Sequence, residues 1–174
     1  MNADQAKFLA EHYAGILENE ISTTAKVLSA VSRGNPNYKP DAKSRSALEL
    51  ASHIAVADNW FLQSVIEGKF EFDQDAAIKA ESQFTNGDEI ASFYQRTVPE
   101  KLKQLRALPA EKLAQDVDFF GMMKAPAVTF LSMTTNHSVH HRGQLAAYLR
   151  AMGSHVPAIY GGSADEPFQA AAAS

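Results

Sequence analysis

Three of the six histidines lie within five positions, at His137, His140 and His141. Residues four positions apart lie one turn apart on the same face of an α-helix, so His137 and His141 can direct their rings to one point. Two imidazoles placed in this way can share one metal ion. A catalytic zinc site takes three protein ligands and leaves one position open. The spacing therefore predicts two ligands of a metal site, and the third must come from elsewhere in the chain.

His53 is the candidate for the third ligand. It lies in the middle of an expected helix, on a line that includes Leu50, Ala57 and Trp60. A lone histidine on such a face is more often a packed core residue than a ligand. Three histidines that can be aligned suit a metal better than a core, because neutral imidazole is a common ligand of transition metals.

His140 competes with His141 for the place of the second ligand on this helix. It follows His137 by three positions, and a helix also brings residues three apart together. We favour His141, because Leu145 and Tyr148 continue its line along the helix. The spacing alone leaves both assignments open.

Arg142 and Gln144 flank the predicted site. We interpret each as a structural anchor at a helix interface rather than as a ligand. Partners that hold the second nitrogen of each metal-bound imidazole are expected at such a site. The sequence does not identify them.

The composition excludes several kinds of chemistry. The chain has no cysteine, so disulfides, thiolate ligands and a cysteine nucleophile are excluded. Its net charge of −4, with both signs interspersed, argues against a nucleic-acid partner. No apolar run is long enough to span a membrane, and the polar N-terminus does not have the pattern of a signal peptide. We expect a cytoplasmic protein that binds neither nucleic acid nor membrane.

Known motifs exclude further functions. The zincin pattern needs a glutamate directly after the first histidine, and Ser138 occupies that position. Di-iron bundles need Glu-x-x-His pairs, of which the sequence has none. It also lacks a phosphate-binding glycine-rich loop and the Gly-x-Ser-x-Gly turn of serine hydrolases.

Apolar residues recur at spacings of three and four along four long segments, which is typical of amphipathic helices. Asp4 is a plausible cap of the first helix, Ser46 and Glu49 fit a capping box, and Gly153 can end the last helix. Pro99 predicts a kink in the third helix or its division into two. The four helices are expected over residues 4–32, 46–68, 86–108 and 127–152.

These segments predict an all-α fold, a four-helix bundle formed by a single domain over residues 1–174, with a long central connection. That connection, residues 69–86, is polar and acidic, and we expect Phe70 and Phe72 to pin it to the surface. A second irregular link is expected over residues 109–126. Its apolar part, 119–123, fits either a packed loop or a lid over the mouth of the bundle.

Several parts of the chain resemble the DinB family of metal-binding four-helix bundles, which includes the YfiT-like metalloenzymes. The resemblance covers nearly the whole chain and lies in Leu48 to Ala55 with Trp60, in Asn136 to Leu145, and in the ending Tyr148 to Gly153 and Val156 to Gly161. It implies an up-down-down-up bundle, a homodimer, and a divalent metal held by three histidines. The first ligand of the family falls on His53. Its His-x-x-x-His pair, directly before Arg-Gly-Gln, falls on His137 and His141, so the resemblance favours His141 over His140.

The wider superfamily includes thiol transferases that use low-molecular-weight thiols. From this resemblance we expect a metal-dependent enzyme, a thiol transferase or a hydrolase, that acts on a small-molecule substrate. An open metal site can bind a thiol as thiolate or activate water. Imidazole ligands suit zinc, nickel, copper or iron, and zinc and nickel are the ions that we expect. Catalytic residues other than the ligands cannot be named.

Two alternatives remain. In the first, the chain is a non-catalytic, dimeric, stress-associated protein that binds metal without turnover. In the second, no metal binds and the three histidines are packed core residues. An opening to solvent beside His53 distinguishes the enzyme from the non-catalytic protein.

Overall fold

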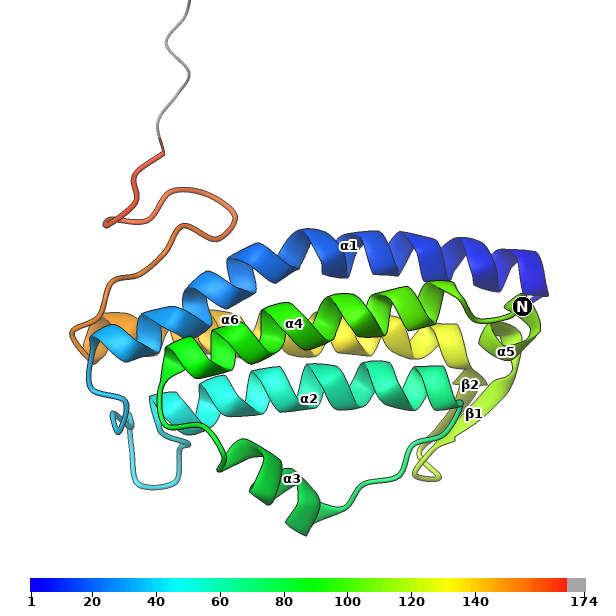
Figure 1. Cartoon of the computed structure of the whole chain (residues 1–174), viewed down its shortest axis with the longest axis horizontal. Helices are drawn as coiled ribbons and strands as arrows, with labels where there is room; N and C mark the ends of the chain where they lie inside the picture. The colour runs from blue at the N-terminus through cyan, green and yellow to red at the C-terminus, as the bar shows by residue number, and fades with distance from the viewer. Residues whose placement is uncertain (169–174) are drawn as a thin grey trace, which may run out of the picture.

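Four long helices form most of the structure, a computed structural model that describes residues 1–168 (Figure 1). They are α1 (Ala3–Ala30), α2 (Ala47–Glu67), α4 (Gly87–Arg106) and α6 (Leu131–Ala151). In Figure 1, α1 and α6 run from right to left, whereas α2 and α4 run from left to right. The predicted all-α fold is confirmed. Residues 169–174, the end of the expected single domain, lie outside the described residues.

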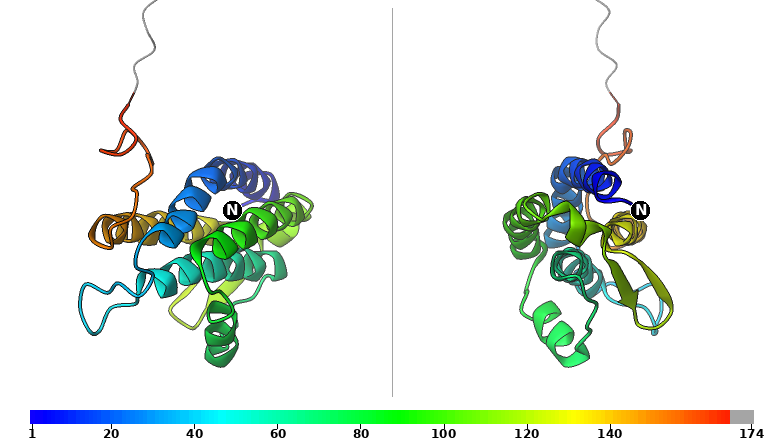
Figure 2. Two further views of the ribbon diagram at one scale, coloured as in Figure 1. Left: turned by 60° about the vertical axis from the view of Figure 1, so that its left-hand side comes forward. Right: turned by 90° about the vertical axis from the view of Figure 1, so that its right-hand side faces the viewer.

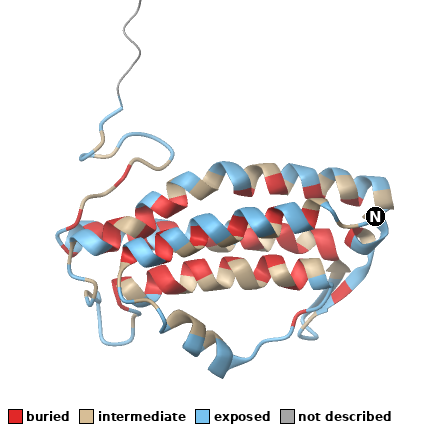
Figure 3. Cartoon of the chain, in the orientation of Figure 1, coloured by how far each residue is buried: buried red, intermediate tan, exposed pale blue. Residues whose placement is uncertain are grey.

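The core lies between these four helices. Helix α1 packs against α4 and α6, and α2 packs against the same two helices, so that the four surround one interior (Figure 2). Each helix buries the stripe that faces the others and exposes the opposite side (Figure 3). Among residues 1–168, no helix combines the length and the apolar character that crossing a membrane requires.

Small residues allow α1 and α4 to approach closely. The inward stripe of α1 begins with the buried residues Ala6, Ala10 and Ala14. At the start of α4, a Cβ atom added to Gly87 would lie 2.3 Å from the backbone oxygen of Leu28, so only glycine fits at this crossing. This close approach fixes the position of the start of α4 against the end of α1.

Two predicted helix ends are observed, and the predicted cap of the first helix is corrected. Ser46 and Glu49 form the predicted capping box at the start of α2. Gly153 follows α6 with φ of 80°, as predicted for a C-terminal glycine. The cap of α1, however, is Asn2, which forms a capping box with Gln5, and the prediction of Asp4 was wrong. Asp4 lies in the first turn, where its charge favours the helix dipole.

Helix α4 continues through Pro99, so of the two predicted outcomes, a kink or a division into two helices, the division does not occur. A proline removes one backbone N–H, which leaves the carbonyl of Gln95 without its helical partner. Both residues are on the exposed side of α4, where water can satisfy that carbonyl. The helix therefore tolerates the missing hydrogen bond.

The central connection contains a helix that we had not predicted. Helix α3 (Gln74–Glu81) is capped by Asp73 and has no buried residue, which explains why periodicity did not reveal it. The two aromatic residues before it differ. Phe70 is buried against the bundle, whereas Phe72 is 58% exposed and contacts Trp60 of α2, with ring centroids 5.7 Å apart.

The second link is more regular than predicted. It holds a short helix, α5 (Ala110–Ala114), and an antiparallel hairpin of β1 (Asp116–Phe119) and β2 (Met123–Pro126). The segments η1 (Val31–Arg33) and η2 (Ala127–Phe130) are 3-10 turns, so α1 ends and α6 begins at other positions than predicted. Within the apolar part of this link, Phe119 packs on Phe70 with ring centroids 5.0 Å apart, while Phe120 is at the exposed tip.

Candidate metal centre

His53, His137 and His141 converge at the interface of α2 and α6. Their ring centroids lie 4.6 to 5.1 Å apart, and one nitrogen from each ring lies within 4.8 Å of the other two. The Nε2 atoms of His53 and His137 are only 3.2 Å apart. All three residues are partly buried. His140, the alternative to His141, is exposed and does not belong to this group.

Each of the three rings has an oxygen partner at its other nitrogen, Nδ1. His53 is 2.9 Å from Glu81 Oε1, His137 is 3.1 Å from Asp58 Oδ1, and His141 is 3.1 Å from Gln144 Oε1. Oxygen acceptors at these positions keep a proton on each Nδ1 and leave the lone pair on Nε2. This set of partners is typical of metal-binding histidines.

Asp58 is the most deeply buried of these partners, with 1% of its surface exposed. Its second carboxylate oxygen accepts a hydrogen bond of 3.0 Å from the hydroxyl of Tyr94 on α4. Burial, together with the charge of Asp58, raises the pKa of Tyr94 well above its usual value, so this phenol remains a donor. The orientation of His137 is therefore held by a residue of α2 and, through it, by one of α4.

Glu81 holds His53 from outside the bundle, because it is the last residue of α3. Its second oxygen pairs with Arg45 at 2.8 Å. Burial alone would raise the pKa of Glu81, but the hydrogen bond from His53 and the charge of Arg45 outweigh it and keep the pKa below its usual value. The carboxylate is thus ionised at neutral pH and a strong acceptor for the His53 ring.

Partial burial lowers the pKa of His141 to about 4, and the neighbouring histidines act in the same direction, although the hydrogen bond to Gln144 opposes them. The ring is therefore neutral at physiological pH, which is the form that binds metals. The chain thus holds His141 ready as a ligand.

The geometry suits a single divalent ion. Two nitrogens bound to one tetrahedral zinc, each at about 2.0–2.1 Å, lie about 3.3 Å apart, close to the 3.2 Å between Nε2 of His53 and of His137. With protons on both Nδ1 atoms, the two Nε2 lone pairs face each other without a hydrogen between them. Such a pair of lone pairs is unfavourable alone and becomes favourable around a cation. The three histidines can therefore hold a metal ion.

A cavity of about 980 Å³ opens above the three rings. His53, His137 and His141 line one part of it, and most of the remaining wall is apolar, from α2, α3 and the tip of the hairpin. A volume of this size is typical of sites for small molecules. The site beside His53 is thus open to a ligand rather than closed by packing.

Sequence reasoning missed Asp58 and Glu81 as partners of the histidines. Asp58 carried one signal that could have identified it, since it is the one charged residue in the mostly apolar run Ile54–Phe61. Glu81 carried none, because it lies in a polar segment 28 positions from His53. Gln144, interpreted as an anchor, contacts the ring of His141 and donates to the hydroxyl of Tyr148 at 3.2 Å.

Arg142 serves as the structural anchor that we predicted. It is 1% exposed, although it is charged and directly follows His141. Its guanidinium donates to Thr24 Oγ1 at 2.8 Å and pairs with Glu20 at 2.5 Å, both on α1. It also donates to the hydroxyl of Tyr160 in the C-terminal segment.

Comparisons with known proteins found one family model and similar relatives. The DinB family model matches residues 3–170. The protein YjoA of Bacillus subtilis strain 168 is 30% identical over 135 residues, which cover 76% of this chain and 83% of YjoA.

Two solved structures have similar folds. The crystal structure of the DinB-like protein YjoA from Bacillus subtilis superposes with a TM-score of 0.65 at 25% identity, over 85% of this chain and 96% of that one. A DinB-like protein from Bacillus cereus superposes with a TM-score of 0.70 at 24% identity, over 86% and 97% of the two chains. The second likeness concerns the fold alone.

Proposed function

This chain belongs to the DinB family, and on that premise we propose that His53, His137 and His141 bind one divalent metal ion in an enzyme that acts on a small molecule. One observation carries the proposal: the three imidazoles meet at the wall of an open cavity of about 980 Å³. A purely structural metal would be enclosed by its ligands. An accessible one can take up a further ligand.

We propose zinc or nickel as the ion. Three neutral nitrogen ligands suit both, and the chain has no cysteine to favour a softer ion. When bound, the ion would supply Lewis acidity, which favours the deprotonated form of a thiol or a water molecule. The reaction class that follows is transfer of a low-molecular-weight thiol to an electrophile or, with water in its place, hydrolysis.

The residues of the chain have distinct roles in this proposal. Glu81 and Asp58 accept hydrogen bonds from the Nδ1–H groups of His53 and His137, which directs both Nε2 atoms to the same point. The apolar wall of the cavity excludes water around a bound substrate, which strengthens electrostatic interactions there. The histidines act as ligands, and the proposal assigns no general base.

A second candidate function rests on the same carboxylates. Asp58 and Glu81, the acids beside the histidines, are both occupied: Asp58 by Tyr94 and His137, and Glu81 by Arg45 and His53. Neither is free to accept a proton from a substrate. The absence of a free carboxylate at the site, within residues 1–168, favours a protein that binds metal without turnover; that such a protein is homodimeric and stress-associated is part of this second proposal.

Cobalt substitution tests the proposal, because cobalt reports its ligands by visible absorption. Metal content is first measured on the purified protein by elemental analysis, with one bound ion per chain as the expected result. Under anaerobic conditions, small thiols are then added to the cobalt form, and a new thiolate-to-cobalt absorption band is expected. A spectrum that no thiol changes would contradict the transferase and favour the second candidate.

A further inference from the structure

Aromatic side chains from three separate segments gather at one side of the cavity. Trp60 of α2 lies between Phe72 of the central connection, with ring centroids 5.7 Å apart, and Phe120 of the hairpin tip, 6.4 Å away and nearly parallel. All three line the cavity that also contains the histidines. We call Trp60, Phe72 and Phe120 the aromatic cradle.

The cradle is exposed to an extent that is unusual for such side chains. Phe72 is 58% exposed and Phe120 is 45% exposed. A position that faces only solvent does not need an aromatic side chain. Ile78 of α3, which also lines the cavity, is 55% exposed. Exposed apolar surface that is concentrated at a cavity indicates a binding site.

The backbone at Phe120 gives a second, independent indication. Phe120 has φ of 54°, in the left-handed region that disfavours residues with a bulky side chain. Glycine or asparagine would fit this turn without strain, and Gly121, next to it, has φ of 71°. Strain of this kind persists where the side chain is needed, and function is the usual reason. The aromatic ring at the tip is therefore retained in spite of the turn.

Most charged and polar side chains of the same wall are already paired within the chain. Arg45 pairs with Glu81, the carboxylate of Asp73 accepts from the backbone of Ala76, and that of Glu71 pairs with Lys69. The indole N–H of Trp60 donates to the backbone oxygen of Glu71 at 2.9 Å. A ligand beside these groups would find acidic side chains nearby and apolar rings to contact. At this wall, away from the histidines, the acidic side chains disfavour an anion and the rings favour a flat, apolar group.

We propose that the aromatic cradle binds a neutral small molecule through a flat aromatic group and holds it beside His53, His137 and His141. The inference rests on the proposed function, which makes the bound molecule the substrate. That substrate is an uncharged aromatic electrophile. The cavity, at about 980 Å³, accommodates both an aromatic group and a small thiol.

Two related dyes test the charge and shape of the ligand. Phenylnaphthylamine is neutral, and anilinonaphthalene sulfonate has the same ring system with an added negative charge. Trp60 is the only tryptophan of the sequence, so energy transfer from it reports binding at the cradle. We expect saturable binding of the neutral dye, about tenfold tighter than that of the anionic one. Equal affinities, or no saturable binding, would overturn the inference.

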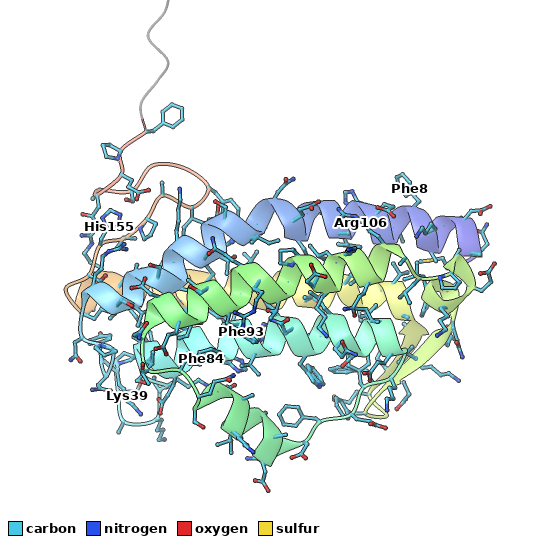
Figure 4. The ribbon with its side chains drawn as sticks, viewed as in Figure 1. Phe8, Lys39, Phe84, Phe93, Arg106 and His155 are labelled. Carbon is cyan, nitrogen blue, oxygen red and sulfur yellow. The ribbon has the colours of Figure 1, made fainter. Side chains whose placement is uncertain are left out.

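Variants locate the binding site. Phe72→Ser and Phe120→Ser should each weaken the binding of the neutral dye about tenfold. Phe8→Ser is the matched control, because Phe8 is 72% exposed on the outer face of α1, away from the cavity (Figure 4). If Phe8→Ser weakens binding as much, or if a cradle variant alters sedimentation of the chain, the patch is general apolar surface or an interface between copies.

Phe120→Gly separates binding from folding. Glycine relieves the strained turn, so this variant should bind the neutral dye about tenfold more weakly without a fall in the thermal unfolding midpoint. A lower midpoint would identify Phe120 as a packing residue and overturn the inference.

All measurements use metal-free and zinc-loaded protein in parallel. If the protein binds the dye but takes up no zinc, the proposal for the aromatic cradle stands and the metal proposal is contradicted. Zinc binding without dye binding would do the reverse.

Discussion

Two polar centres lie on the same helix, at adjacent positions of the sequence. His141 and its two companions form the histidine centre on the α2 side of α6, whereas Arg142 with Glu20, Thr24 and Tyr160 forms what we call the arginine anchor on the α1 side. Both bring charged or polar groups into a helix interface. They differ in whether the chain satisfies those groups by itself.

In the arginine anchor, the partners of the guanidinium belong to the chain. Arg142 donates to Thr24 and Tyr160, pairs with Glu20, and lies over the ring of Tyr160 with 5.1 Å to its centroid. In the histidine centre, the chain supplies oxygen partners on the Nδ1 side of each ring, and the rings converge on one point beside a cavity. Polar groups that are fully paired within the chain, as in the arginine anchor, indicate a role in the stability of the fold. Ring nitrogens that converge on one point, as in the histidine centre, indicate a role in binding a ligand.

Removal of a ligand should have the largest effect. Loss of a residue that only hydrogen-bonds a metal ligand weakens metal binding by about 10- to 100-fold. His137→Ala removes a ligand itself, so it should weaken metal binding by more than about 100-fold. His140→Ala is the matched control, an exposed histidine on the same helix, and should bind metal as the wild type does. Isothermal titration with zinc measures both. Equal losses in the two variants would remove the distinction between the centre and its neighbours.

Removal of Arg142 should affect stability and leave metal binding unchanged. Arg142→Met takes away the charge that pairs with Glu20 inside the bundle, and unpaired buried charges are costly. Because Glu20 is partly exposed and can rehydrate, we expect a loss of about 2 kcal/mol, or a midpoint about 4–8 °C lower. Thermal unfolding measures this, and zinc affinity is measured in parallel. A variant that keeps its midpoint but loses zinc would reverse the roles that we assign.

A smaller effect is expected from the outer partner of His53. Glu81→Gln keeps the shape of the side chain but loses the negative charge that holds the His53 Nδ1 proton. Metal affinity should fall about tenfold. Asp75→Asn, another acid of α3 that is exposed, is the control and should leave the affinity unchanged. If the two variants behave alike, α3 contributes only general charge.

The smallest effect concerns pH. The pKa of His141 is about 4 in the folded protein and about 6.5 in an unfolded chain. Between these values the unfolded state binds more protons, so metal-free protein should lose stability as the pH falls from 7 to 5. After a reduction for partial exposure of the ring, we expect about 1 kcal/mol. Urea unfolding at both pH values checks this.

His141→Gln should show less of this pH dependence, because glutamine does not titrate. An equal loss in the wild type and the variant would mean that His141 is not held neutral by its surroundings. Such a result would make the histidine centre resemble an ordinary exposed cluster.

Local features of the sequence were sufficient for much of the fold. Spacings of three and four residues identified all four long helices, and the capping box at Ser46 and the glycine at position 153 marked two of their ends correctly. The exposed, polar helix α3 and the hairpin were missed, since neither has a long apolar stripe. Periodicity reports burial, and elements with little burial give no such signal.

The sequence by itself determined that His137 and His141 share one face, because the repeat of a helix fixes the angle between residues four apart. Only the tertiary structure decided which side chains hold them. Asp58 and His137 are 79 positions apart, and His53 and Glu81 are 28 apart. Their contacts depend on how whole helices pack, to within tenths of an ångström, and no local pattern encodes that distance. The helix repeat likewise sets His141 and Arg142 about 100° apart on α6, whereas only the packing of α1 and α2 decided that one meets the histidine centre and the other the arginine anchor.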